Sequence, residues 1–231
     1  MIIGILSDAH GNIYGLQECL HLLEQANADR IFFLGDAVDY FSRSREVLGL
    51  LKHKKVTCVK GNHENLLLTG NETSSDAREI YNLDHTISTL QPEDYAYMAS
   101  WEDSIELALD GVRVLMVHGS PFDNLEEYVY PDSDLSRFLD LEYDVILMGH
   151  THIPFVYDKG GKTIVNAGSA GFRRDDGRFL SCAVLDSVKR HVRILKSSFP
   201  ATHMDSLKPF HADIHRVLER RADYRSKLLE R

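Results

Sequence analysis

Five short apolar runs, rich in isoleucine, valine, leucine and phenylalanine, are the feature that most constrains the fold of this 231-residue chain. Each run is too short for a helix and shows no helical period, so we expect buried β-strands. The expected strands cover residues 2–6, 31–34, 56–59, 112–117 and 145–148.

Helical patterns lie between the early strands. Apolar residues recur at three- and four-residue steps over 13–23, where Asn12 is a suitable N-cap, and a shorter pattern covers 47–51. Residues 75–100 are expected to form two helices. A last amphipathic helix is expected over 213–229, with its many arginines on a solvated face.

The second half of the chain contains two hairpin patterns. One pairs residues 155–157 with 163–165, and the other pairs 180–186 with 191–195. Strands that alternate with helices, followed by a hairpin-rich half, indicate an α/β fold of two packed mixed β-sheets flanked by helices. The length suits a single domain over residues 1–231.

Composition limits the classes of function. The formal net charge of −9 argues against a basic surface that tracks nucleic acid, so nucleic acid is not an expected partner. No apolar run approaches the roughly 20 residues of a membrane span, and the start of the chain lacks a signal-peptide pattern. Cys19, Cys58 and Cys182 lie in apolar runs and are expected to be reduced core residues, which suits the cytoplasm.

Side chains that can bind metal ions follow each of the five expected strands, usually beside a glycine. In chain order they are Asp8 and His10, Asp36, Asn62 with His63, His118, and His150 with His152. Ligands of open α/β sheets bind at the carboxyl ends of strands, so we expect these side chains to meet in one crevice. A single Asp-x-His doublet is usually surface or capping chemistry, but five strand ends in this order predict a metal site.

The spacing within the doublets suits shared coordination. Asp8 and His10 are two residues apart, so in an extended chain they point to the same side, and His150 and His152 repeat that arrangement. Nearby glycines at 35, 61, 119 and 149 allow close approach of the backbone. Carboxylate, imidazole and amide ligands without a thiolate favour borderline divalent ions over a structural cysteine–zinc site.

These segments resemble the signature of the calcineurin-like metallophosphoesterases. The matching segments are Asp8-Ala9-His10, Gly35-Asp36-Ala37-Val38-Asp39, Gly61-Asn62-His63-Glu64, Val117-His118-Gly119 and Gly149-His150-Thr151-His152. Asn166-Ala167-Gly168-Ser169, followed by Arg173 and Arg174, extends the likeness to a bacterial-type subgroup of small single-domain phosphodiesterases. That subgroup commonly has proline in place of Ala167, and often Gly-Tyr-Gly where this chain has Asp39-Tyr40-Phe41.

The resemblance implies a four-layer αββα sandwich and a centre of two divalent ions, which could be Mn, Fe, Zn, Co or Ni. In that assignment Asp8, His10 and His152 hold one ion, while Asn62, His118 and His150 hold the other. Asp36 bridges both ions, and His63 acts on the phosphate as general acid or charge stabiliser without binding metal. A hydroxide that bridges the two ions would attack phosphorus.

Other polar residues are candidates for weaker roles. Asn12 either caps the first helix or faces a substrate anion. Arg173 and Arg174 either bind a substrate phosphate or are solvated surface residues. Asp39 either orients a ligand histidine or is a plain turn carboxylate.

The expected function is hydrolysis of small phosphodiesters, with a small phosphate ester as partner and no membrane. A nucleotide-polyphosphate hydrolase, a phosphomonoesterase and a non-catalytic metal-binding scaffold are the alternatives, and the negative net charge counts against a nuclease. The helix expected over 213–229 could support a homo-oligomer, although packing against its own domain is simpler.

Overall fold

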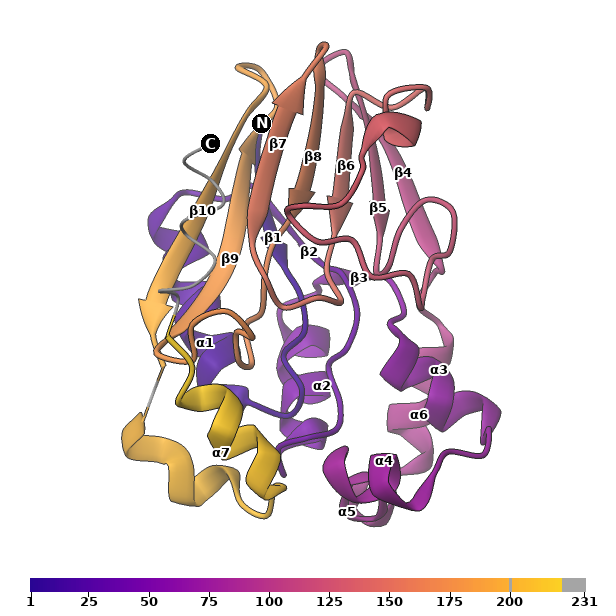
Figure 1. The fold of residues 1–231 in the computed structure, drawn as a ribbon, viewed down its shortest axis with the longest axis vertical. Helices are drawn as coiled ribbons and strands as arrows, with labels where there is room; N and C mark the ends of the chain where they lie inside the picture. Colours follow the sequence, from indigo (N-terminus) through magenta and orange to yellow (C-terminus); the bar gives the residue numbers. More distant parts are fainter. Residues whose placement is uncertain (200, 222–231) are drawn as a thin grey trace.

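Two five-stranded sheets lie face to face in the computed structural model, which describes residues 1–199 and 201–221 (Figure 1). The first sheet has the order β10-β9-β1-β2-β3, and the second has the order β4-β5-β6-β8-β7. The strands of the first sheet are β1 (Ile2–Leu6), β2 (Arg30–Phe33), β3 (Thr57–Cys58), β9 (Phe179–Asp186) and β10 (His191–Ser198). Those of the second are β4 (Ser104–Leu109), β5 (Val112–Val117), β6 (Val145–Met148), β7 (Phe155–Lys159) and β8 (Lys162–Asn166).

Both sheets are mixed. In the first sheet β1, β2 and β3 run parallel, and β9 pairs antiparallel with β1. In the second sheet β5, β6 and β8 run parallel, with β4 and β7 antiparallel at the two edges. The carboxyl ends of the parallel strands of both sheets therefore supply the loops that build the site.

The side chains of each strand alternate between two cores, as a pleated strand requires. In β5, Val114 and Met116 point between the sheets, where they meet Ile3 and Ile5 of β1. Leu115 and Val117 of the same strand point to the outer face of the second sheet. There they pack with Val129, Leu135 and Phe138, in a segment that includes the short 3₁₀ helix η1 (Ser136–Phe138).

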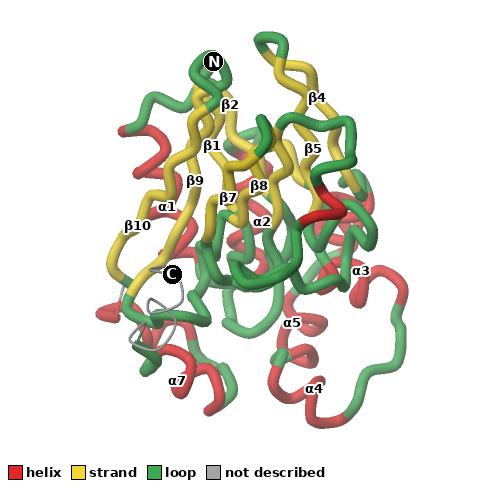
Figure 2. Tube along the Cα trace, turned by 45° about the horizontal axis from the view of Figure 1, so that its top comes forward, coloured by secondary structure: helices red, strands yellow, loops and turns green. Residues whose placement is uncertain are grey.

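Helices α1 (Ile13–Gln25) and α2 (Ser44–His53) pack on the outer face of the first sheet through their apolar sides. Asn12 caps α1, because its side chain accepts a hydrogen bond from the Gly15 amide. The remaining helices are α3 (Asn62–Thr69), α4 (Ser75–Ile80), α5 (Leu83–Thr89), α6 (Pro92–Ala99), the 3₁₀ helix η2 (Ala201–Leu207) and α7 (Ala212–Leu218). Figure 2 shows the loops gathered between the strands and this lower group of helices.

The structure confirms the expected α/β fold and all nine strands that the sequence predicted, with shifts of up to three residues at their ends. The prediction of two helices over 75–100 was wrong, because three form there. Asn82 adopts a left-handed conformation between α4 and α5 and so breaks the helical path.

A helix was also expected over 213–229. In the described residues it is shorter and ends at Leu218. Residues 222–229 lie outside the described part.

Cys19, Cys58 and Cys182 are buried and free, as the sequence predicted. Among the described residues, no helix combines the length and the apolar character needed to cross a bilayer.

Candidate metal centre

Six buried carboxylate and imidazole side chains from loops of both sheets meet at the carboxyl ends of the strands. They form two groups, and within each group the ligand atoms lie within 4.8 Å of one another. The first group is Asp8, His10 and His152, and the second is Asp36, His118 and His150. A third group within the same limit joins His10 and Asp36 to His63. The convergence predicted from the sequence is therefore present in the fold.

Short distances link the members of each group. His152 Nε2 lies 3.0 Å from His10 Nε2 and 3.2 Å from Asp8 Oδ1. In the second group, His118 Nε2 lies 3.1 Å from His150 Nδ1 and 3.0 Å from Asn62 Oδ1. Asn62, which follows β3, therefore reaches the group built around His118.

Asp36 lies between the two groups. Its Oδ2 atom is 3.5 Å from His10 Nε2 and 3.2 Å from His118 Nε2. This is the position that a carboxylate shared by two neighbouring ions would need.

The backbone reaches this arrangement in a way the sequence analysis did not expect. The prediction of an extended Asp8–His10 segment was wrong, because Asp8 (φ 54°) and His10 (φ 47°) are both left-handed. His150 (φ 67°) and His152 (φ 57°) repeat the same pattern, and Asp36 also has a positive φ of 62°. Asp and His tolerate this region better than most residues, so the ligands converge through tight loops rather than along strands.

Backbone carbonyl groups orient three of the histidines. The Nδ1 atoms of His10, His118 and His152 lie 2.9, 2.7 and 3.0 Å from the carbonyl oxygens of Val38, Leu34 and Phe172. Because a carbonyl only accepts, each Nδ1 carries a hydrogen, and the Nε2 atom of each ring faces the cluster. Such partners commonly fix the tautomer of metal-binding histidines.

His63 lies in the first turn of α3 beside the cluster, and a carboxylate fixes its ring. Its Nδ1 atom lies 2.8 Å from Asp39 Oδ2, and its Nε2 atom lies 4.0 Å from Asp36 Oδ2. Burial would lower the pKa of His63, but the carboxylates of Asp36 and Asp39 raise it above the usual value. Asp39 therefore orients His63, whereas the sequence analysis had considered it for a ligand histidine.

Glu64 is a buried residue of the site whose role the sequence analysis missed. Its carboxylate accepts backbone N–H bonds from Asp36, Ala37 and Gly61 at 2.7–2.8 Å, so it joins the loop after β2 to the start of α3. Burial and the nearby Asp36 charge raise the pKa of Glu64 to about 7. The capping-box spacing from Gly61 to Glu64 was the signal that could have revealed it.

Two of the predicted glycines are needed for close packing at the cluster. A Cβ atom on Gly61 would collide with Asp36 Oδ1, and one on Gly149 would lie 2.7 Å from Asp8 Oδ2 and collide with the Ser7 hydroxyl. Each glycine thus lets another loop approach a ligand carboxylate.

Burial and crowding set the protonation of the cluster. Burial lowers the pKa of His10 and His152 well below the usual value and lowers that of His150 to about 3, so these imidazoles are neutral. Burial would also lower the pKa of His118, but Asp36 raises it to about 10. His118 and the ionised Asp36 therefore form an ion pair in which a proton occupies the place of a cation.

The donor set fits divalent metal ions. Asp8 Oδ1 and His150 Nε2 are buried and make no hydrogen bond within the described part of the chain. Buried polar atoms rarely lack a partner, and lone pairs that converge from carboxylates and neutral imidazoles suit a cation.

The remaining candidates differ in whether their side chains already form hydrogen bonds or ion pairs within the protein. The Asn12 carbonyl accepts from Gly15 and its amide donates to the Gly171 carbonyl, so both groups bond within the protein. Arg173 forms a two-point ion pair with Asp175. Arg174 has no carboxylate within 4.0 Å among the described residues, and its guanidinium lies 3.4 Å from the Tyr40 hydroxyl.

Comparison with known families and sequences agrees with this geometry. A family model described as calcineurin-like phosphoesterase superfamily domain matches residues 1–190. An uncharacterized protein of Methanocaldococcus jannaschii is 28% identical over 222 residues, covering 86% of this chain and 88% of the relative. A probable metallophosphoesterase of the same organism is 26% identical over 176 residues, covering 73% of this chain and 68% of the relative.

Solved structures share the fold over nearly the whole chain. A metallophosphoesterase from Sphaerobacter thermophilus superposes with a TM-score of 0.74 at 25% identity and covers 95% of this chain and 98% of that one. A hypothetical protein from Pyrococcus horikoshii OT3 superposes with a TM-score of 0.82 at 18% identity, covering 94% and 97% of the two chains.

Proposed function

The chain belongs to the calcineurin-like phosphoesterase superfamily, which implies metal-dependent hydrolysis of phosphate esters, and we propose that it hydrolyses small phosphodiesters at a centre of two divalent ions. The observation that carries this proposal is the position of Asp36, whose Oδ2 atom lies within 3.5 Å of a histidine from each ligand group. A single carboxylate placed in this way suits two ions that share a ligand.

The proposed ligands follow the two groups. Asp8, His10 and His152 would hold one ion, and Asn62, His118 and His150 would hold the other. Asp36 would contact both. When bound, the two ions would lower the pKa of a water molecule and neutralise charge on the phosphoryl oxygens.

His63 would complete the site without binding metal. With Nδ1–H donated to Asp39, its Nε2 atom faces the cluster and can hold a proton for the departing oxygen of the ester. Because its ring is buried and fixed, this proton is positioned before the substrate arrives.

Arg174 is the better of the two arginine candidates for contact with the substrate phosphate. Its guanidinium lacks a carboxylate partner among the described residues, whereas that of Arg173 is occupied by Asp175. An anionic substrate would supply the missing counter-charge.

The test is hydrolysis of bis(p-nitrophenyl) phosphate by purified protein loaded with Mn²⁺, together with metal content measured by mass spectrometry. We expect about two ions per chain in the wild type, and for Asp36→Asn a lower metal content and a loss of turnover of 100-fold or more. Equal turnover by wild type and Asp36→Asn with every metal tried would refute the proposal. p-Nitrophenyl phosphate in the same assay separates diesterase from monoesterase preference.

A further inference from the structure

An exposed aromatic ring lies directly against the cluster. The ring of Tyr128 is centred 3.9 Å from that of His150 at a tilt of 39°, yet 45% of the Tyr128 surface is exposed. Tyr130 stacks on Tyr128 at 6.0 Å with their planes 13° apart. Three rings, Tyr130, Tyr128 and His150, therefore form a row that leads into the metal centre.

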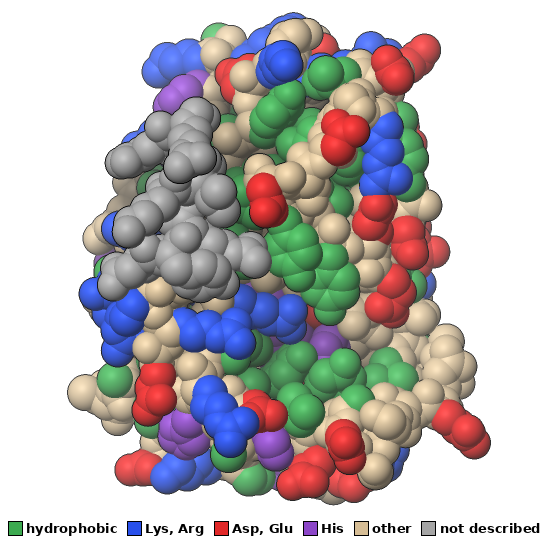
Figure 3. Space-filling model, in the orientation of Figure 1, with side chains coloured by type: hydrophobic (Ala, Val, Ile, Leu, Met, Phe, Trp, Pro, Cys, Tyr) green, Lys and Arg blue, Asp and Glu red, His purple; other side chains and the backbone are tan. Residues whose placement is uncertain are grey.

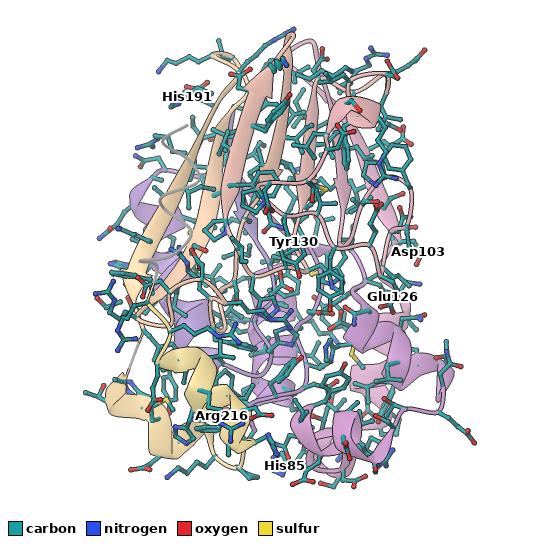
Figure 4. The ribbon with its side chains drawn as sticks, in the orientation of Figure 1. His85, Asp103, Glu126, Tyr130, His191 and Arg216 are labelled. Carbon is teal, nitrogen blue, oxygen red and sulfur yellow. The ribbon has the colours of Figure 1, made fainter. Side chains whose placement is uncertain are left out.

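This row lies on an accessible face of the molecule. Figure 4 labels Tyr130 near the middle of the face, and Figure 3 shows hydrophobic side chains gathered in the same region beside Lys and Arg side chains. The other large aromatic side chain among the exposed described residues, Phe122, is also 45% exposed. It packs on Phe138 and under Arg137 instead of contacting the cluster.

Positive charge adjoins the aromatic row. Burial would lower the pKa of the Arg174 guanidinium, but the neighbouring Tyr40 and Tyr128 raise it above the usual value. Among the described residues, Arg174 has no carboxylate within 4.0 Å, and its backbone N–H bonds to the His152 carbonyl. A half-buried cation next to a site for divalent ions needs an anion beside it.

We propose that Tyr128 and Arg174 form a subsite for a nucleotide-type ester, with the aromatic base stacked on Tyr128 and the phosphate charge met by Arg174. This inference rests on the proposed function, because it names the substrate class of the same site. An aliphatic diester would leave the exposed ring unused, whereas any nucleobase offers a face to stack on it. Stacking of a base on an aromatic side chain is sequence-tolerant and contributes measurably to affinity.

The test compares two substrates with the same leaving group in Mn²⁺-loaded protein: the p-nitrophenyl ester of thymidine 5′-monophosphate and methyl p-nitrophenyl phosphate. We expect the wild type to prefer the nucleoside ester by 10-fold or more in kcat/KM. Tyr128→Ala should reduce this preference to about threefold or less, mainly by raising KM, while its activity on the methyl ester stays within about threefold of wild type. Tyr128→Phe should keep most of the preference.

Phe122→Ala is the matched control, because Phe122 is equally exposed but does not contact the cluster. It should retain the full preference. The subsite is refuted if the wild type shows no preference, or if Tyr128→Ala lowers hydrolysis of both esters by the same factor, which indicates a structural effect of the ring.

A binding measurement separates failure of this inference from failure of the proposed function. Calorimetric titration with thymidine 5′-monophosphate and with methyl phosphate requires no turnover. We expect the nucleotide to bind 10-fold or more tightly than methyl phosphate in wild type and Phe122→Ala, and about equally in Tyr128→Ala. If neither ester is hydrolysed but this pattern holds, the subsite stands and the phosphodiesterase proposal falls. Equal affinities in the wild type refute the subsite.

Discussion

Left-handed backbone conformations are concentrated in the residues of the metal centre. Five of the seven proposed ligands, together with Asp39 and Tyr40, have φ between 47° and 70°. Such conformations cost about 1–3 kcal/mol each in residues other than glycine and persist where the surrounding structure enforces them. Here the enforcing contacts include hydrogen bonds between loops, such as Asp8 N–H to the Gly35 carbonyl at 2.9 Å. The fold therefore holds the ligand loops in place before any ion binds.

A substitution can distinguish the role of His63 in turnover from the role of the ligands in metal binding. His63→Gln removes the ring nitrogen that faces the cluster but none of the proposed ligand atoms. We expect it to retain about two ions per chain and to lose turnover by about 100-fold or more, as expected for the loss of a general acid. Metal analysis and kcat for bis(p-nitrophenyl) phosphate check this together. Loss of an ion from His63→Gln would instead place His63 among the ligands, as its grouping with His10 and Asp36 allows.

The two neighbouring arginines provide a matched comparison. Arg174→Gln removes a guanidinium that no carboxylate among the described residues balances, whereas Arg173→Gln removes one already paired with Asp175. We expect Arg174→Gln to lower kcat/KM by about 10-fold or more, since a hydrogen bond to a charged group contributes about 1.5–3 kcal/mol. Arg173→Gln should stay within about threefold of wild type. The reverse order of effects in steady-state kinetics would show that Arg173 meets the substrate.

At the level of elements, the sequence predicted every strand of the described residues except β4. β4 was not predicted, because this edge strand alternates exposed residues, such as Glu106, with half-buried ones and so lacks a continuous apolar run. α3 was not predicted, because its first residues, Asn62 and His63, were considered only as candidate site residues. The extended backbone assumed for Asp8 and His10 was wrong, yet the motifs still identified these residues as candidate ligands. The reason is that the prediction depended on the residue types and their order along the chain.

Contacts between distant loops could not be predicted in the same way. The carbonyls that orient the histidines come from Leu34, Val38 and Phe172, whose side chains carry no information about their backbone oxygens. The partnership between Asp39 and His63 likewise depends on how α3 is placed against the loop after β2. Such contacts follow from tertiary structure and leave no local pattern.

Two glycines in different elements should respond oppositely to the same substitution. Gly49 lies exposed in α2 with open space around its Cβ position, so Gly49→Ala should stabilise the protein by about 0.5–1 kcal/mol. Gly61→Ala should be destabilising and impair metal binding, because the added methyl group would meet the Asp36 carboxylate. Thermal unfolding of both variants checks the pair. A Gly61→Ala protein with wild-type stability and metal content would contradict the packing at the cluster.

At the scale of the whole molecule, the centre lies where the two sheets meet. Asp8, His10 and Asp36 follow β1 and β2 of the first sheet, whereas His118, His150 and His152 follow β5 and β6 of the second. Each proposed ion would therefore have ligands from both sheets. In the absence of metal, this junction holds buried carboxylates and imidazoles, with the ion pair of Asp36 and His118 among them. Bound metal should consequently stabilise the packing of one sheet on the other.

Removal of metal should lower the unfolding temperature of the whole protein. A ligand at 100 times its Kd stabilises the folded state by about 2.7 kcal/mol, which for a chain of this size corresponds to about 5–10 °C. We expect that difference in calorimetric scans of Mn²⁺-loaded and chelator-treated wild type. Asp36→Asn should show less than half of it, because the carboxylate between the groups is lost. Asp103→Asn, an exposed carboxylate paired with Lys60, should show the full difference. Equal shifts in Asp36→Asn and the wild type would mean that the stabilising ions bind elsewhere.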